Sequence, residues 1–286
     1  MMLSLKARPL FSSSFFLAFS PPKRLSQLNL PFLTRSPSRS SPSTLSVSMS
    51  STTPAQTIEH VVLFNVKQGT DPAKLNAMLS GLSALTSLDT VLHLTASPIL
   101  CNRSSAFSFT HILHSRYASK DDLSAYAAHP NHLAVVKESV LPICEDVMAV
   151  DWVADHVPIP VGISPGSPVR ITFLKLKENV TDEAKEQIFG VVKGIKHNFP
   201  GISQITCGEN FSPGRAKGFS IASIAAFKDL GAMEAVESNE ELVNLQKEKV
   251  RDHLESVIVV DFIVPSSSQS SSLVCCDVLC DFVIAV

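Results

Sequence analysis

Short, mostly apolar stretches recur along the chain, and a stretch with helical spacing follows two of them. The stretches 60–66 and 170–176 are rich in β-branched and aromatic or aliphatic residues, which predicts a strand at the start of each half. Asp71 and Thr181 follow them, and both suit a helix N-cap because their side-chain oxygens accept free backbone N–H groups of a first turn. Apolar residues then recur every three or four positions, which predicts one buried face on each helix: Leu75, Met78, Leu79, Leu82 and Leu85 on the first, and Ile188, Phe189, Val192 and Ile195 on the second.

Two further strands follow each predicted helix. They are expected near 91–97 and 107–117 in the first half, and near 201–207 and 217–227 in the second. Their length and turn-rich boundaries are those of paired strands. Each half therefore continues its sheet before a second helix begins.

The second helix of the first half is predicted in two parts. Ser119 begins a short helix, because an aspartate three residues later completes the spacing of a capping box. His129-Pro130 breaks it, since the residue before a proline is pushed out of the α region. A longer helix is predicted from about 131 to 145, and a strand over 147–153 ends this half.

The order of elements in each half is β-α-β-β-α-β, which is the order of the ferredoxin-like fold. We therefore predict an α+β protein in which each half forms an antiparallel sheet with both helices on one face. The other face would be left uncovered and partly apolar, so it needs a partner. Two such sheets packed face to face make a barrel. They come either from the two halves of one chain, as a pseudo-dimer, or from two chains, as a homodimer.

The two halves share sequence at a constant offset of 110 positions, the distance from Asp151 to Asp261. The same offset pairs Lys137-Glu138 with Lys247-Glu248. A repeat this long is a small domain, since solenoid repeats have periods of roughly 20–50 residues. We predict a first domain at 57–155, a linker at 156–166 and a second domain at 167–265.

The N-terminal residues 1–50 are predicted to be a transit peptide rather than part of the fold. Residues 1–58 contain no Asp or Glu but six Lys or Arg, and the first 50 are rich in Ser and Pro. This composition is typical of organelle import, and we favour the chloroplast. Met49 offers an alternative start, which would leave the product in the cytoplasm.

The C-terminal residues 266–286 are a Ser-rich linker followed by an apolar tail that contains cysteines. The tail is too short to cross a bilayer as a helix, so no membrane span is predicted. In an isoform that ended at Leu273, the last three residues would resemble a peroxisomal signal. The role of residues 274–286 stays open.

Charge and metal-ligand spacing exclude two classes of partner. Without the six N-terminal basic residues, 18 Lys or Arg stand against 26 Asp or Glu, a formal charge of −8. Nucleic-acid binding needs a clustered basic face, and the sequence shows none. No Cys or His spacing matches a structural zinc site, so no cofactor is evident.

Four segments of the first half carry a family resemblance, and they are Glu59–Phe64, Phe109–Ile112, Tyr126–His132 and Val150–Val153. The third has the form Tyr-x-x-His-Pro-x-His and is the most specific. Together they look like the stress-response A/B barrel domain, a dimeric α+β barrel family of plant stress proteins. The resemblance is strong over 57–155 and weaker over 167–265. It implies a two-domain, organelle-directed plant member.

More distantly, the chain is similar to olivetolic acid cyclase, an enzyme of this family that closes a linear polyketide by an aldol reaction. That resemblance implies catalysis by Tyr126 and His132. Imidazole can remove the α-proton, and a phenol can donate to the enolate oxygen, without a metal. Val236 and Leu242 stand at the equivalent positions of the second half, which we therefore interpret as a built-in partner without chemistry of its own.

The other candidate residues have local alternatives. His129 sits at the helix break, where it can act as a cap or a packing residue. His132 can instead form a structural pair with Asp151. Strand alternation is taken to point His60 and His111 into the barrel, where they either line a pocket or fill the core.

A magnesium ion is implied by the resemblance alone. Some relatives hold Mg²⁺ through backbone carbonyls near the end of the first helix, which corresponds to about Ser83, Thr86 and Asp89 here. Carbonyl sites leave no pattern of side chains to recognise in a sequence.

The leading prediction is a stress-related protein that is non-enzymatic or binds a small apolar molecule. The first alternative is a polyketide-cyclase-like enzyme that works in the first domain. The second alternative is an oligomeric, chaperone-like scaffold. An enzyme or a binding protein needs an open cavity in the first domain, lined by Tyr126 and His132, and a filled barrel would rule out both. The sequence does not reveal whether such a pocket is open.

Overall fold

The computed structural model describes residues 56–104, 106–154, 157 and 161–266. The predicted transit segment and nearly all of the predicted C-terminal tail lie outside these residues, as does part of the predicted linker.

The elements of the first repeat alternate as predicted, and in chain order they are β1 (Thr57–Val66), α1 (Pro72–Ala84), the 3-10 turn η1 (Leu85–Ser87), β2 (His93–Pro98), β3 (Cys101–Arg103), β4 (His111–Tyr117), α2 (Lys120–Ala128), α3 (Pro130–Val135), the π turn η2 (Val136–Val140) and β5 (Cys144–Ala154). Those of the second repeat are β6 (Pro168–Leu176), α4 (Asp182–Asn198), β7 (Ile202–Glu209), the 3-10 turn η3 (Pro213–Arg215), β8 (Ile221–Phe227), α5 (Leu230–Glu237), α6 (Glu240–Lys249), the 3-10 turn η4 (Arg251–His253) and β9 (Leu254–Ile263).

The first helix of each repeat begins at the predicted cap. Asp71 Oδ1 accepts the backbone N–H of Ala73 at 2.7 Å, and Thr181 Oγ1 accepts that of Ala184 at 3.3 Å. The predicted apolar face of α1 is confirmed, because all of its residues pack in one cluster with the sheet. Local capping and helical periodicity therefore explain where these helices lie.

The second helix of the first repeat is shorter than predicted. The break at His129-Pro130 is confirmed, since α2 ends one residue before it and α3 begins at the proline. The predicted extent of 131–145 was wrong, because α3 widens into η2. There the Leu141 N–H bonds to the carbonyl of Val136, five residues back, at 2.9 Å. The chain then enters β5 at Cys144.

The strand predicted at 107–117 is also shorter, because β4 begins only at His111. The preceding residues leave their own sheet. Cys101–Arg103 form β3 and pair antiparallel with β9 of the second repeat. This crossing brings Arg103 into the second repeat, a placement that no local pattern predicts.

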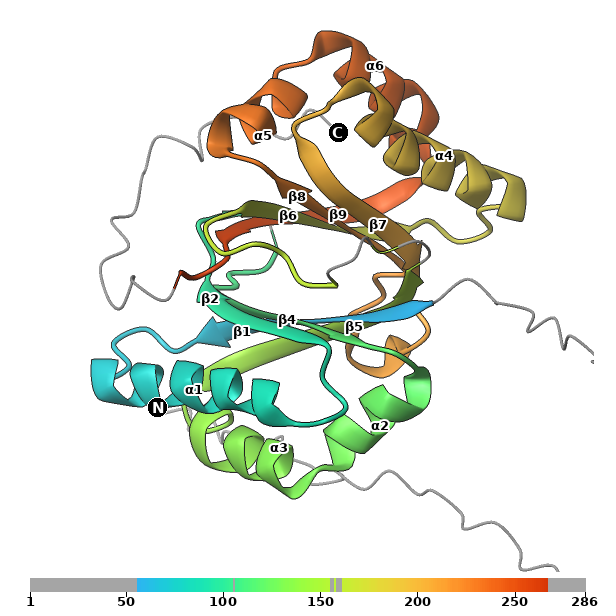
Figure 1. Cartoon of the computed structure of the whole chain (residues 1–286). Coiled ribbons are helices and arrows are strands. Elements are labelled where there is room, and N and C mark those ends of the chain that lie inside the picture. Colours follow the sequence, from blue (N-terminus) through green and yellow to red (C-terminus); the bar gives the residue numbers. More distant parts are fainter. Residues whose placement is uncertain (1–55, 105, 155–156, 158–160, 267–286) are drawn as a thin grey trace, which may run out of the picture. The chain divides into compact units, whose positions relative to one another are not determined.

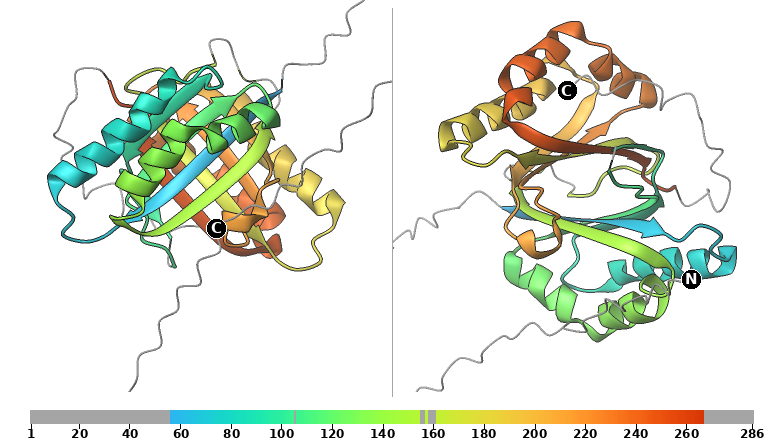
Figure 2. Two further views of the ribbon diagram at one scale, coloured as in Figure 1. Left: turned by 90° about the horizontal axis from the view of Figure 1, so that it is seen from below. Right: turned by 180° about the vertical axis from the view of Figure 1, so that it is seen from behind.

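The strands form two antiparallel sheets, β2-β4-β1-β5 and β3-β9-β6-β8-β7 (Figure 1). Reading the second sheet from β7 to β9 gives the same order as in the first, and β3 of the first repeat is added at its edge. The register repeats as well, since His60 lies opposite Asp151 and Arg170 lies opposite Asp261. Helices α1–α3 cover the outer face of the first sheet and α4–α6 that of the second (Figures 1 and 2). The prediction of two tandem ferredoxin-like domains is confirmed.

The inner faces of the two sheets share one hydrophobic core. Val61 of β1, Trp152 of β5 and Phe173 of β6 all belong to it, and each is at most 1% exposed. Their neighbours along each strand point outward to the helices. The apolar sheet face that we expected to need a partner is therefore covered by the other repeat of the same chain.

None of the helices in the described part of the chain is long and apolar enough to span a membrane.

Candidate functional sites

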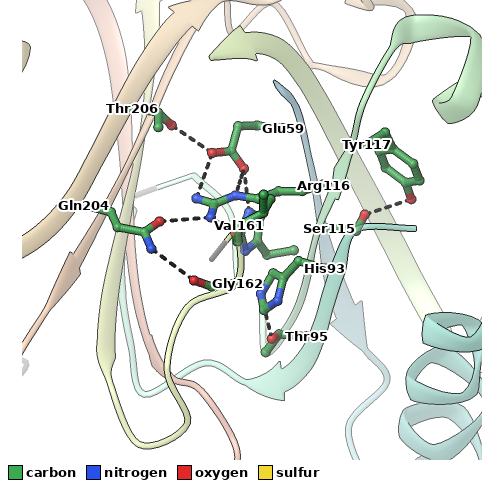
Figure 3. Close-up of polar contacts among 11 residues, drawn as sticks. Glu59, His93, Thr95, Ser115, Arg116, Tyr117, Val161, Gly162, Gln204 and Thr206 are labelled. Carbon is green, nitrogen blue, oxygen red and sulfur yellow. Dashed lines mark hydrogen bonds and ion pairs between the residues drawn. The ribbon is translucent and has the colours of Figure 1, made fainter. Parts of the chain in front are cut away.

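A charged cluster is buried between the two sheets (Figure 3). Arg116 donates to both oxygens of the Glu59 carboxylate, from Nη2 to Oε1 at 2.9 Å and from Nε to Oε2 at 3.0 Å. Thr206 of the second repeat donates from Oγ1 to Glu59 Oε1 at 3.0 Å. Burial alone would raise the pKa of Glu59. The charge and hydrogen bonds of Arg116, together with the hydrogen bond from His114, outweigh burial and lower the pKa of Glu59 to about 2.

Two histidines complete this cluster. His114 Nε2 donates to Glu59 Oε2 at 2.6 Å, and Nδ1 has no hydrogen-bond partner in the described part of the chain. A neutral ring with its proton on Nε2 fits both facts. Burial lowers the pKa of His114 despite the attraction of Glu59. Burial likewise lowers the pKa of His93, whose ring centroid is 5.3 Å from that of His114, to about 3.

The cluster also holds the chain that connects the repeats. Arg116 Nη1 donates to the carbonyl of Val161 and to Gln204 Oε1, while Gln204 Nε2 donates to the next carbonyl along the connecting chain at 3.0 Å. These contacts join both repeats to the connecting segment, so we interpret the cluster as structural. Sequence reasoning did not single it out. A signal was present, because strand alternation puts Glu59 on the same face as Val61.

Four of the six predicted site residues come together between the first sheet and its helices. His60 Nδ1 lies 2.5 Å from Asp151 Oδ1. The ring centroids of Tyr126 and His132 are 4.6 Å apart, and the His60 centroid is 6.3 Å from that of Tyr126. Tyr117 stands beside them, with its ring centroid 5.1 Å from that of Tyr126. The motif therefore meets residues from two distant strands.

The expected direction of His60 and His111 was wrong. Their chain neighbours Val61 and Ile112 point into the core between the sheets, so both histidines face the helices. The period was correct, but it was assigned to the wrong face of the sheet. His111 Nδ1 lies 2.8 Å from Thr110 Oγ1, outside the cluster, and burial lowers its pKa to about 4.

His129 is a helix cap and does not join the group formed by Tyr126, His132, His60 and Asp151. Its Nδ1 accepts the backbone N–H of Asn131 at 3.2 Å. The alternative pair of His132 with Asp151 does not form, because Asp151 pairs with His60. His132 Nδ1 donates instead to the carbonyl of Ala127 at 3.0 Å.

The surroundings of Tyr126 and His132 favour a neutral phenol beside a neutral imidazole. Burial raises the pKa of Tyr126 to about 12. Burial also lowers the pKa of His132, against the opposing effect of the Ala127 carbonyl. Because Nδ1 of His132 carries the donated proton, Nε2 is its basic nitrogen. Burial would raise the pKa of Asp151, but the charge and hydrogen bond of His60 lower it.

The corresponding place in the second repeat contains a cavity of about 250 Å³. It lies between the outer face of the second sheet and helices α4–α6. Val236 and Leu242 line it at the positions of Tyr126 and His132, and Ser223 lines it at the position of a leucine. These smaller or more flexible side chains leave space that two rings fill in the first repeat. The second repeat, interpreted from the sequence as a built-in partner without chemistry of its own, thus also contains a cavity.

Four charged side chains gather at one part of this cavity. Arg170 donates to Asp261 in two bonds, from Nε to Oδ1 at 2.8 Å and from Nη2 to Oδ2 at 2.9 Å. Arg103 Nη1 donates to Asp261 Oδ2 at 2.6 Å. Glu237 contacts both arginines, 3.0 Å from Arg170 Nη2 and 3.2 Å from Arg103 Nη2.

The turn predicted to hold magnesium is η1 and its flanks. Ser83, Thr86 and Asp89 are exposed there, and the carbonyl of Ser83 already accepts the backbone N–H of Leu85. The magnesium site stays a prediction. In the ranges that the structure describes, no three His, Cys, Asp or Glu side chains are placed to hold a metal.

Comparison with known proteins places the chain in a family. The family model of the stress responsive A/B barrel domain matches twice, at residues 58–154 and 169–264. The chain is 58% identical over 272 residues to a stress-response A/B barrel domain-containing protein of Arabidopsis thaliana, covering 95% of this chain and all of that protein. It is 52% identical over 213 residues to a second Arabidopsis protein of the same description, covering 74% of this chain and 98% of that protein.

A solved structure shares the two-repeat fold. The protein from Fusobacterium nucleatum named "Putative monooxygenase (FN1347)" has a TM-score of 0.55 at 14% identity, covering 74% of this chain and 94% of that one. At this level of identity the likeness concerns the fold alone.

Proposed function

This protein is a two-domain member of the stress responsive A/B barrel domain family, and we propose that it acts as a binding protein for a small, largely apolar molecule. The observation that carries the proposal is the cavity of the second repeat. It has mostly aliphatic walls and a few convergent polar groups, which is the usual composition of a ligand site.

The size of the cavity limits the ligand. A dry apolar cavity of about 150 Å³ binds benzene, so a cavity of about 250 Å³ accommodates on the order of ten heavy atoms. A straight eight-carbon chain with a polar end has this size. Selective binding to the folded state must stabilise it, which makes ligand binding visible in a melting curve.

The test uses 1-octanol as a neutral probe. We expect it to raise the melting temperature of the full chain and to show saturable binding by titration calorimetry. Val236→Tyr copies the first repeat and fills the cavity, so it should abolish binding. Ala235→Tyr adds the same ring at an exposed position one residue away and should not. Equal binding by the two variants, or no binding by the unmodified protein, contradicts the proposal.

A second candidate function is favoured by the cluster in the first repeat. Tyr126 and His132 lie side by side with the His60–Asp151 pair next to them, which supplies a proton acceptor and a donor. We propose an aldol cyclisation of the olivetolic acid cyclase type as the chemistry to test there. Tyr126 is only 2% exposed, so a substrate needs a local opening to reach it.

The scaffold alternative rests on uncovered sheet edges and on the family's oligomerisation. In the structure β2 and β5 are the edge strands of the first sheet, and β3 and β7 are those of the second. Light scattering at several concentrations tests this alternative. A chain that stays monomeric at every concentration would contradict it.

We also propose plastid import through residues 1–50, on their acid-free, basic and Ser-rich composition. Fluorescent fusions with and without this segment test it. Loss of plastid signal on deletion supports the proposal, whereas continued import contradicts it. Fusions that end at Leu273 or begin at Met49 test the peroxisomal and cytoplasmic alternatives.

A further inference from the structure

The charged group beside the second-repeat cavity contains two carboxylates in different situations. Asp261 is 1% exposed and accepts three hydrogen bonds from Arg103 and Arg170. The Glu237 side chain is 25% exposed and is held only at the outer Nη2 atoms of the same arginines. Asp261 is thus the fixed counter-ion, and Glu237 is the more accessible one.

Glu237 is the last residue of α5, at the edge of the cavity. Its carboxylate bridges the two guanidinium groups at 3.0 and 3.2 Å. Each arginine thus gives Glu237 one charge-assisted contact, whereas the two-bond fork of Arg170 is used on Asp261. A free carboxylate that replaced Glu237 would meet the same donors.

The charge balance also favours a carboxylate over other polar groups. Two guanidinium groups face two carboxylates, so exchange of Glu237 for an external carboxylate leaves the balance unchanged. An ammonium group would instead be repelled by both arginines, and a neutral group would bring no negative charge to them. Burial would lower the pKa of Arg170, but Asp261 and Glu237 raise it, so the arginine stays charged.

The apolar part of the cavity gives an external ligand an advantage over Glu237. Leu242, Val236 and Phe227 line the same cavity as the two arginines. The Glu237 side chain extends from the end of α5 and has only two methylene groups. A ligand with a longer hydrocarbon chain buries more apolar surface while making the same ionic contacts.

We propose that the second-repeat cavity binds a medium-chain aliphatic monocarboxylate, whose carboxylate displaces Glu237 from Arg103 and Arg170. This rests on the proposed function, because it names the ligand class of the same cavity. Glu237 then serves as an internal substitute that occupies the anion position until a ligand enters. Arg103 comes from the first repeat, so ligand binding also draws on the crossing strand β3.

The test compares octanoate, 1-octanol and octylamine by titration calorimetry with the full chain. Octanoate should bind at least about tenfold more tightly than either other compound. Glu237→Gln removes the competing carboxylate and should tighten octanoate binding about tenfold, while 1-octanol binding changes less than about twofold. Glu234→Gln, an exposed glutamate on the same helix, removes the same charge outside the cavity and should change neither.

The outcomes separate the two proposals. If 1-octanol binds as tightly as octanoate, or if Glu234→Gln tightens octanoate binding as much as Glu237→Gln does, the carboxylate proposal is overturned and the binding function stands. If none of the three compounds binds any variant, both are overturned. A structure with octanoate bound supports the proposal when its carboxylate lies on the two arginines, and overturns it when the chain enters in the opposite direction.

Discussion

Thr206 donates a hydrogen bond to Glu59 across the space between the two sheets, with 3.0 Å between Thr206 Oγ1 and Glu59 Oε1. The two residues lie 147 positions apart in the chain, and both are buried. Together with the Glu59–Arg116 ion pair, this hydrogen bond joins the repeats beside the hydrophobic core that they share. The packing of one repeat on the other therefore depends on a satisfied charge as well as on hydrophobic burial.

Removing the Glu59 charge should destabilise the fold strongly. Glu59→Gln removes the carboxylate that pairs with the buried Arg116. Breaking a buried ion pair costs about 3–5 kcal/mol. Thr206→Val removes only one hydrogen bond to the same carboxylate, which costs about 1 kcal/mol. Urea unfolding followed by circular dichroism measures both. Equal and small losses would show that the ion pair does not hold the repeats together.

Acid should destabilise the folded protein as the pH falls below about 6.5. Burial lowers the pKa of His93 to about 3 and of His111 to about 4, from ordinary values near 6.5. Between the lowered pKa of each histidine in the folded protein and its ordinary pKa near 6.5, the unfolded chain binds more protons than the folded chain. The free energy of unfolding therefore has its full value above about pH 6.5 and decreases as the pH falls. The slope approaches about 1.4 kcal/mol per pH unit for each histidine. Glu59, with its pKa lowered to about 2, adds a further loss at lower pH.

Urea midpoints at a series of pH values from 7.5 to 4 test this acid sensitivity. His111→Gln should reduce the slope, because one group no longer titrates. His197→Gln changes an exposed histidine and should leave the slope unchanged. A midpoint that stays constant down to pH 4 would rule out buried neutral histidines.

Gly208 lets the two repeats approach closely. A Cβ there would lie 2.8 Å from the carbonyl oxygen of Val153 and 3.0 Å from Cδ1 of Trp152, both in the other repeat. Gly208→Ala should therefore cost about 1–3 kcal/mol, as overpacking usually does. At Gly214 a Cβ meets nothing within 4 Å, so Gly214→Ala should change stability by less than about 0.5 kcal/mol. Melting curves compare the two, and an equal effect would contradict the close approach.

The sequence predicted what depends on local pattern and on internal repetition. The caps at Asp71 and Thr181, the break at His129-Pro130 and the order of strands follow from nearby residues, and the offset of 110 required two like domains. The sequence did not show which face of each strand lies between the sheets. Alternation separates the side chains into two faces but does not tell which of them is inward. His60 and His111 were placed on the wrong one for this reason.

The cavity and its charges depend on contacts that no local pattern contains. Arg103 reaches Asp261 only because β3 crosses to the other sheet. Substitution of Tyr126 by Val236 was visible in the sequence, but it was interpreted as loss of chemistry. A smaller side chain in an otherwise repeated framework also predicts empty space, and that signal could have located the cavity.

The candidate chemistry of the first repeat predicts a particular set of mutant activities. With a linear polyketide as substrate and product measured by chromatography, His132→Ala should lose about 10²–10⁴-fold in rate, the usual contribution of general acid–base catalysis. Tyr126→Phe removes the donor but keeps the packed ring, so it should lower the rate without a comparable fall in melting temperature. His129→Asn keeps a capping side chain, as Asn239 does in the second repeat, and should retain activity.

The pH dependence of that reaction provides a second test. Burial lowers the pKa of His132, so the ring is neutral and able to accept a proton at lower pH than an ordinary histidine. The rate should therefore rise with pH through a midpoint below about 6.5 and then stay level through neutrality. A rate that is equal in wild type and His132→Ala, together with a melting temperature several degrees lower in the variant, would assign His132 to the support of the helix alone.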